Sequence, residues 1–138
     1  MSFSFRIRAR GLPVMDKGLE GSSADPYFKL YVNDNKIYQS KVVKNTLNPD
    51  FKKFKLDRDD ISDTPMVSDI KIVIKDDDWG NKDDIIGECY FKIINQKNVG
   101  ASCEPLQLHS GPGGGCLFIK VDESGDSSSD SDWLKSVN

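Results

Sequence analysis

The first ten residues alternate strictly between apolar and polar side chains, and this pattern constrains the fold more than any other feature. Phe3, Phe5, Ile7 and Ala9 fall on one side of an extended chain, and the intervening arginines fall on the other. Segments of similar kind recur along the chain, separated by Gly, Asn, Asp and Pro. The expected strands are 3–9, 28–32, 37–44, 51–56, 70–74, 87–93, 105–108 and 117–121. With room for only one helical turn within 57–68, the sequence predicts an all-β fold, an eight-stranded antiparallel β-sandwich.

The length and charge distribution predict one folded domain followed by a tail. The 138 residues suffice for a single core. Residues 122–138 are rich in Ser and Asp and carry five acids and one lysine, so they are expected to lack order. Residues 1–121, the expected domain, carry 18 basic and 17 acidic side chains, which gives no reason to expect nucleic-acid binding.

Cysteine usage and hydropathy indicate a cytoplasmic protein. The three cysteines are odd in number and form no Cys-x-x-Cys pair, so neither a disulfide framework nor a structural zinc site is expected. Cys89 shares parity with Phe91 and is predicted to be a buried free thiol. No apolar run is long enough to cross a bilayer and no secretory signal is present, so any membrane contact is expected to be peripheral.

Two acidic loops are expected to meet at one end of the sandwich. Alternating strand direction brings the connections 11–26, 45–50 and 75–86 to the same end. The third contains KDDDWGNKDDIIG, with five aspartates in nine residues, and the first contains Asp16 and Asp25. Two carboxylates about 4 Å apart repel each other by roughly 4 kcal/mol at an effective dielectric near 20. Such a cluster either solubilises a turn or holds a cation.

Several short segments together resemble the C2 domain family. They are LPVMD (12–16), ADPYFKLYV (24–32), KNTLNPDF (44–51), IVIKDDD (72–78) and DDIIGE (83–88). Their order and spacing cover nearly all of residues 3–121. A strand at each end of that range resembles the family's circularly permuted, type II arrangement, which implies a Greek-key sandwich.

This resemblance implies a calcium site built from aspartates of the first and third connections, holding two or more Ca²⁺ ions. The positions that match the ligand pattern are Asp16, Asp25, Asp76, Asp77 (through its carbonyl), Asp78 and Asp84. Asp16 departs from the pattern, because it precedes Asp25 by nine residues where six is usual. Glu20 is an alternative ligand in the lengthened loop.

An oxygen-rich donor set suits calcium, which takes 6–8 oxygen ligands with flexible geometry. Zinc prefers Cys or His, and the one histidine, His109, lies outside the cluster. An EF-hand does not fit, because the sixth and twelfth positions counted from Asp76 are Asn81 and Gly87 instead of Gly and Glu.

Two regions are candidates for lipid contact. Trp79 and Gly80 are expected at the tip of the third connection, where the indole either inserts into a membrane interface or packs back across the loops. Tyr27, Lys29 and Lys41 are expected on an outward face that, in some C2 domains, binds phosphoinositide headgroups. A lysine face that is merely solvated is the alternative, since Ile37 and Gln39 replace two lysines usual at that site.

The resemblance implies a calcium-dependent peripheral module that binds anionic phospholipid, either phosphatidylserine or a phosphoinositide. We expect a monomeric cytoplasmic sensor or adaptor, recruited to membranes when calcium rises. The alternative is a C2 module that binds a protein or a phosphoinositide without calcium. No enzyme is expected, because the chain lacks a Gly-x-Ser-x-Gly elbow and its SGPGGG lacks the Lys-Ser/Thr of a phosphate loop.

Overall fold

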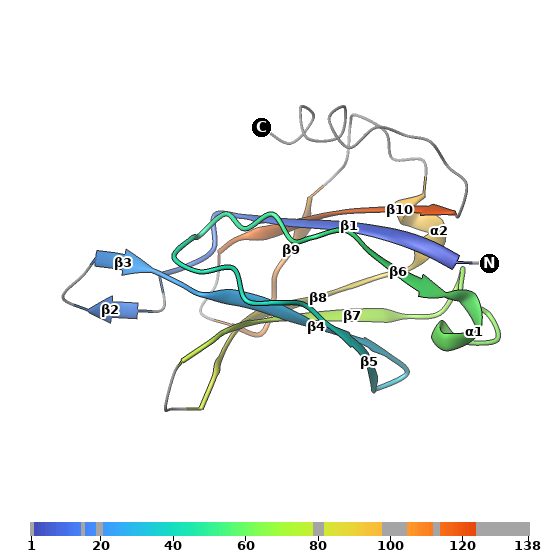
Figure 1. Ribbon diagram of the computed structural model, residues 1–138, viewed down its shortest axis with the longest axis horizontal. Helices are drawn as coiled ribbons and strands as arrows, with labels where there is room; N and C mark the ends of the chain where they lie inside the picture. Colours follow the sequence, from blue (N-terminus) through green and yellow to red (C-terminus); the bar gives the residue numbers. More distant parts are fainter. Residues whose placement is uncertain are drawn as a thin grey trace.

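The computed structural model is a sandwich of two four-stranded antiparallel sheets (Figure 1), which confirms the predicted fold class. It describes residues 2–14, 16–18, 21–78, 82–97, 105–111 and 114–123, with the backbone alone for 16–18 and 21–23.

The first sheet has the strand order β6-β1-β10-β9 and joins the two ends of the domain. Its strands are β1 (Ser2–Arg10), β6 (Phe54–Asp57), β9 (Leu106–Gln107) and β10 (Cys116–Glu123). β1 pairs with β10 along its length, with Ile7 opposite Ile119. β10 continues to Glu123, two residues beyond the expected domain boundary at 121.

The second sheet has the order β5-β4-β7-β8. Its strands are β4 (Pro26–Val32), β5 (Asn35–Gln39), β7 (Ile70–Asp76) and β8 (Asp84–Phe91). β4 lies between β5 and β7, and Leu30 is opposite Ile72 across the β4–β7 pair. Both residues are fully buried, so this face of the sheet closes the core against the first sheet.

Three local elements differ from the sequence prediction. A short hairpin of β2 (Asp16–Gly18) and β3 (Gly21–Ser23) forms in the glycine- and serine-rich first connection, outside both sheets. The expected strand 37–44 ends at Gln39, after which Ser40 hydrogen bonds to Phe28 through an irregular backbone. The helical turn expected within 57–68 is α1 (Arg58–Ile61), whereas α2 (Ile93–Gln96) replaces the end of the expected strand 87–93.

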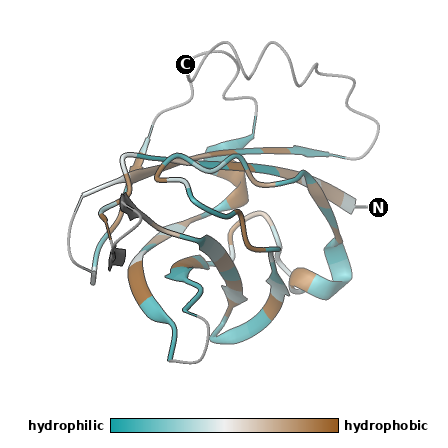
Figure 2. Cartoon of the chain, turned by 60° about the vertical axis from the view of Figure 1, so that its left-hand side comes forward, coloured by the Kyte–Doolittle hydropathy of each residue, from teal (hydrophilic) through white to brown (hydrophobic). Residues whose placement is uncertain are grey.

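Aromatic rings fill the centre of the sandwich. Phe28 is fully buried, and its ring centroid lies 4.9 Å from that of Phe51 and 5.7 Å from that of Phe54. Phe54 also stacks on Phe5 and on Tyr38. Figure 2 shows the corresponding alternation of hydrophobic and hydrophilic residues along the strands. Alternating side chains of β1, β4 and β6 therefore meet in one aromatic core.

Cys89 is buried and free, as the sequence predicted. Burial raises the pKa of its thiol to about 12, because the thiolate would lose its hydration. In the described ranges, the two helices have four residues each, and neither is long or apolar enough to cross a membrane.

Candidate metal and lipid site

Three connections that are distant in sequence lie at one end of the sandwich, the left-hand end in Figure 1. They join β1 to β4, β5 to β6, and β7 to β8. This is the arrangement that the antiparallel order predicted. Loops held at one end of a rigid scaffold are common positions for binding residues.

Asp25 ties the three connections together. Its carbonyl oxygen accepts a hydrogen bond from Asp77 N at 3.0 Å, and its Oδ1 accepts one from Asn45 N at 2.8 Å. Its own backbone N–H donates to Oδ1 of Asp76 at 2.7 Å. One residue of the first connection is thus bonded to the second connection and to the end of β7. The backbone at this end is held by fixed hydrogen bonds, which reduces the entropy that a ligand would have to remove.

Asp76 occupies a core-facing position at the last residue of β7. It continues the inward row of Ile70, Ile72 and Ile74, yet it is a carboxylate only 1% exposed. A charged group at such a place is costly unless it has partners, and the Asp25 N–H is one of them. Asp84, the first residue of β8, is its cross-strand partner and is exposed. The two predicted ligands therefore flank the root of the third connection.

Asp83 organises the third connection, although the family pattern gave it no role. Its Oδ1 accepts a hydrogen bond from Asp78 N at 3.0 Å, and its Oδ2 accepts one from the Tyr27 hydroxyl. The Tyr27 hydrogen bond, followed by that from Asp78, lowers the pKa of the Asp83 carboxyl below its usual value. Burial, followed by the bond to Asp83, raises the pKa of the Tyr27 phenol. Tyr27 is buried and has a structural partner in Asp83, which differs from the outward position expected for it, and its role in lipid contact stays a prediction.

Replacing Tyr27 with Phe is expected to lower the free energy of unfolding at pH 7 by about 1 kcal/mol, the usual net value of one hydrogen bond. Because the folded-state pKa of Asp83 is lowered, the stability from this bond is present above the ordinary carboxyl pKa and is lost as pH falls through the lowered one. Urea unfolding should therefore show a smaller difference between the two chains at about pH 2 than at pH 7. Tyr31→Phe is the matched control, since the Tyr31 ring and its contact with Lys71 are retained. An equal loss in both variants would contradict the assignment.

The structure describes the positions of some predicted metal ligands and leaves others outside the described residues. It brings Asp25, Asp76 and Asp77 into direct hydrogen-bonded contact, with Asp78 next to Asp77 in the chain and Asp84 opposite Asp76 across the β7–β8 pair. The backbone of Asp16 pairs with Ser23 in the β2–β3 hairpin, but its side chain, Glu20, Trp79 and Gly80 lie outside the described residues. Among the side chains described, no three acidic, His or Cys groups are arranged to hold a metal. The donors that are present are all oxygens, which is the chemistry Ca²⁺ prefers.

The outward face of the second sheet is the other candidate region. Tyr31, Lys71 and Tyr90 form a cross-strand row over β4, β7 and β8, and Lys71 Nζ lies 4.9 Å from the centroid of the Tyr31 ring. Lys29 lies on the same strand as Tyr31, two residues earlier. Lys41 follows the end of β5 and is exposed.

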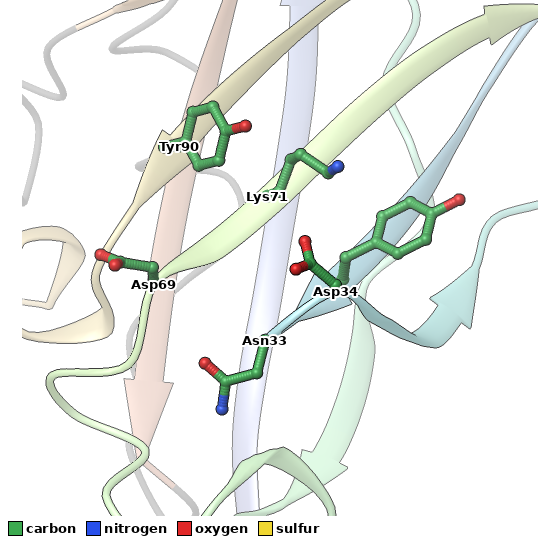
Figure 3. Close-up of a pocket in the computed structure, with 6 residues that line it drawn as sticks. Asn33, Asp34, Asp69, Lys71 and Tyr90 are labelled. Carbon is green, nitrogen blue, oxygen red and sulfur yellow. The ribbon is translucent and has the colours of Figure 1, made fainter.

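A hollow of about 240 Å³ lies at the far end of this face (Figure 3). It is lined by Tyr31, Asn33, Asp34, Asp69, Lys71 and Tyr90. Asp34 directs its carboxylate into the hollow, whereas Asp69 points away and forms an ion pair with Lys92 at 2.6 Å. A carboxylate beside the single lysine of the hollow disfavours a phosphate group there.

Comparison with known proteins identifies the class of this chain. The sequence model of the C2 domain matches residues 5–108, so the chain belongs to the C2 domain family. It is 35% identical over 94 residues to Copine-D and 30% identical over 90 residues to Copine-B, both from Dictyostelium discoideum. These matches cover 58% and 62% of this chain, but only 18% and 16% of the two copines.

Solved structures share the fold. BON1-C2B has a TM-score of 0.66 at 21% identity, covering 89% of this chain and 91% of that one. The calcium-bound tandem C2 domains of Extended-Synaptotagmin 2 give a TM-score of 0.61 at 24% identity, covering 87% of this chain and 45% of that one. The family and the sandwich are thus established together.

Proposed function

We propose that this chain binds calcium at the loop end of the sandwich and, when calcium is bound, attaches to anionic phospholipid surfaces. The carrying observation is the network in which Asp25 joins all three connections and donates its N–H to Asp76. Membership of the C2 family and the calcium-bound relative of similar fold support the same proposal. In this proposal the chain is a cytoplasmic binding module without catalytic activity.

In this proposal, the position of each residue at the loop end sets its role in binding. Asp76 and Asp84 flank the root of the third connection, Asp78 lies on it, and Asp25 fixes it against the first connection. Without a cation, this end carries several carboxylates and is repelled by an anionic membrane. Bound Ca²⁺ would neutralise that charge and offer open coordination positions to lipid phosphate oxygens. Trp79, expected at the tip, would then contact the interface.

Calcium is expected to raise the melting temperature of the chain, whereas magnesium at the same concentration raises it much less. Binding to the folded state alone adds about 2.7 kcal/mol of stability at a concentration 100 times the dissociation constant. Scanning calorimetry with CaCl₂, MgCl₂ or chelator measures this directly.

Two double variants provide the control for that measurement. Each removes two negative charges, one pair at the loop end of the sandwich and the other pair at the opposite end. Asp78→Asn with Asp84→Asn should abolish the calcium effect, since both positions belong to the loop end. Asp59→Asn with Asp60→Asn changes two exposed acids on α1, at the other end of the molecule, and should leave it intact. A calcium effect of the same size in both double variants would contradict the proposal.

The alternative is a module that binds a phosphoinositide or a protein partner through the face bearing Lys29, independently of calcium. Lys29, Lys71 and Lys75 on neighbouring strands support it, and Asp34 in the adjoining hollow counts against it. Lys29→Ala should then reduce binding to phosphoinositide vesicles in chelator while leaving phosphatidylserine binding unchanged.

A further inference from the structure

Three consecutive aspartates of the third connection are each held by a hydrogen bond to a neighbouring segment. The side chain of Asp76 accepts one from Asp25 N, and Asp77 N donates one to the Asp25 carbonyl oxygen. Asp78 depends on a different residue, because its N–H donates to Oδ1 of Asp83 at 3.0 Å. Asp83 therefore fixes the backbone of a predicted calcium ligand, although it is not one of the predicted ligands itself.

A β-bulge in the β7–β8 pair turns Asp83 toward Tyr27. The register between these two strands shifts near the start of β8. Cys89 faces the core, and strict alternation would put Ile85 and Asp83 on that same side. Instead Ile86 is 1% exposed and Ile85 is 48% exposed, so the residues that precede the bulge have changed side. As a result, Asp83 falls on the side of the sheet that carries Tyr27.

Tyr27 fixes the Asp83 carboxylate in turn. Its hydroxyl donates to Oδ2 while Oδ1 accepts the Asp78 N–H, so each oxygen is bonded to a different segment of the chain. Tyr27 is 5% exposed and belongs to β4, which has β5 on one side and β7 on the other. A buried ring on a central strand has little freedom to move. The hydrogen bonds thus link the backbone of Asp78 to the rigid part of the sandwich.

We propose that Tyr27 is a positioning residue for the calcium site and acts on it through Asp83, an inference that rests on the proposed function. The two hydrogen bonds hold Asp78 in place before calcium arrives, so binding removes less conformational entropy. Without them, the connection populates other conformations, and the apparent calcium affinity falls in proportion to the fraction that can bind. Tyr27 is uncharged at neutral pH, so its effect on affinity comes from position and not from charge.

Amide hydrogen exchange in the calcium-free chain tests the positioning itself. The exchange rate of the Asp78 amide proton, followed by NMR, should rise at least about fivefold in Tyr27→Phe, the factor that corresponds to one net hydrogen bond. Tyr31→Phe is the matched control and should leave the rate unchanged, since Tyr31 lies on the same side of β4 but four residues further from the loop end. An unchanged Asp78 rate in Tyr27→Phe would overturn the proposal.

Calorimetric titration with CaCl₂, well below the unfolding temperature, tests the effect on binding. Tyr27→Phe should weaken the calcium affinity about fivefold, whereas Tyr31→Phe should bind like the natural chain. If Tyr27 had only a structural role, its loss would lower stability without changing the affinity of the folded chain. Faster amide exchange with unchanged affinity would therefore overturn this inference alone. A natural chain that binds no calcium would contradict the proposed function, and this inference with it.

Two variants of Asp83 separate its position from its charge in the same titration. Asp83→Asn and Asp83→Ala both remove the negative charge, but asparagine can still accept the Asp78 N–H and donate to the Tyr27 hydroxyl oxygen. We expect the alanine variant to bind calcium at least about fivefold more weakly than the asparagine variant. Adding Tyr27→Phe to Asp83→Ala should weaken binding no further, because Tyr27 acts through Asp83. Equal affinities of the two Asp83 variants would overturn the proposal.

Discussion

Replacing Asp76 and Asp78 with asparagine is expected to abolish calcium-dependent binding to phosphatidylserine vesicles. Each replacement removes one negative charge from the third connection while preserving shape. We expect the calcium affinity to fall at least about 100-fold, or about 2.7 kcal/mol, which is less than one close charge pair contributes at an effective dielectric near 20. Vesicle flotation across a calcium titration measures the effect.

The geometry makes this variant informative, because asparagine keeps the oxygen that matters for the fold. Oδ1 of Asp76 accepts the Asp25 N–H, and an amide oxygen can accept the same bond. If the variant folds but no longer binds vesicles in calcium, the loss is therefore due to the removed negative charges and not to a change in the fold. Asp59→Asn with Asp60→Asn should bind like the natural chain, and binding that persists after the change at Asp76 and Asp78 would contradict the proposed site.

Replacing Phe28 with alanine is expected to lower the free energy of unfolding by about 3–5 kcal/mol, the usual cost of deleting a buried aromatic side chain. Phe28 is fully buried, and its ring contacts that of Tyr38 on β5, that of Phe51 just before β6 and that of Phe54 on β6. A cavity there would loosen the packing of both sheets. Urea unfolding monitored by circular dichroism gives the value.

Tyr90→Ala is the control for Phe28. Tyr90 is also an aromatic residue of the second sheet, but its side chain is 58% exposed. We expect a loss below about 1 kcal/mol there, as is usual for surface positions. Similar losses at the two positions would mean that the aromatic core does not carry the stability assigned to it.

The strand positions could be predicted from the sequence, because burial of one strand face places apolar residues at every second position. Ile70, Ile72 and Ile74 share one side of β7 while Lys71 and Lys75 lie on the other, since only the first side faces the core. The β2–β3 hairpin could not be found in this way, because Gly and Ser give it no alternation. α2 was missed for a related reason, since Ile93 is buried from a helical turn as completely as it would be from a strand.

The sequence could predict those parts of the candidate site that depend only on the order and direction of the strands. Antiparallel pairing alone brings the first and third connections together, and Asp25 and Asp76 indeed meet there. The role of Asp83 was not predictable, because its partner Tyr27 lies 56 residues away and is met only through the β4–β7–β8 arrangement. The burial of Arg6 and Arg8 was missed as well, since alternation reports which side of a strand a residue occupies and not what covers that side.

Co-sedimentation of the natural chain with phosphatidylserine liposomes, in calcium and in chelator, tests the central claim most directly. Our account predicts that the chain pellets with the liposomes in calcium and stays in the supernatant in chelator. Equal pelleting under both conditions would assign membrane contact to the lysine-bearing second sheet. The absence of pelleting in calcium would contradict a calcium-gated membrane module.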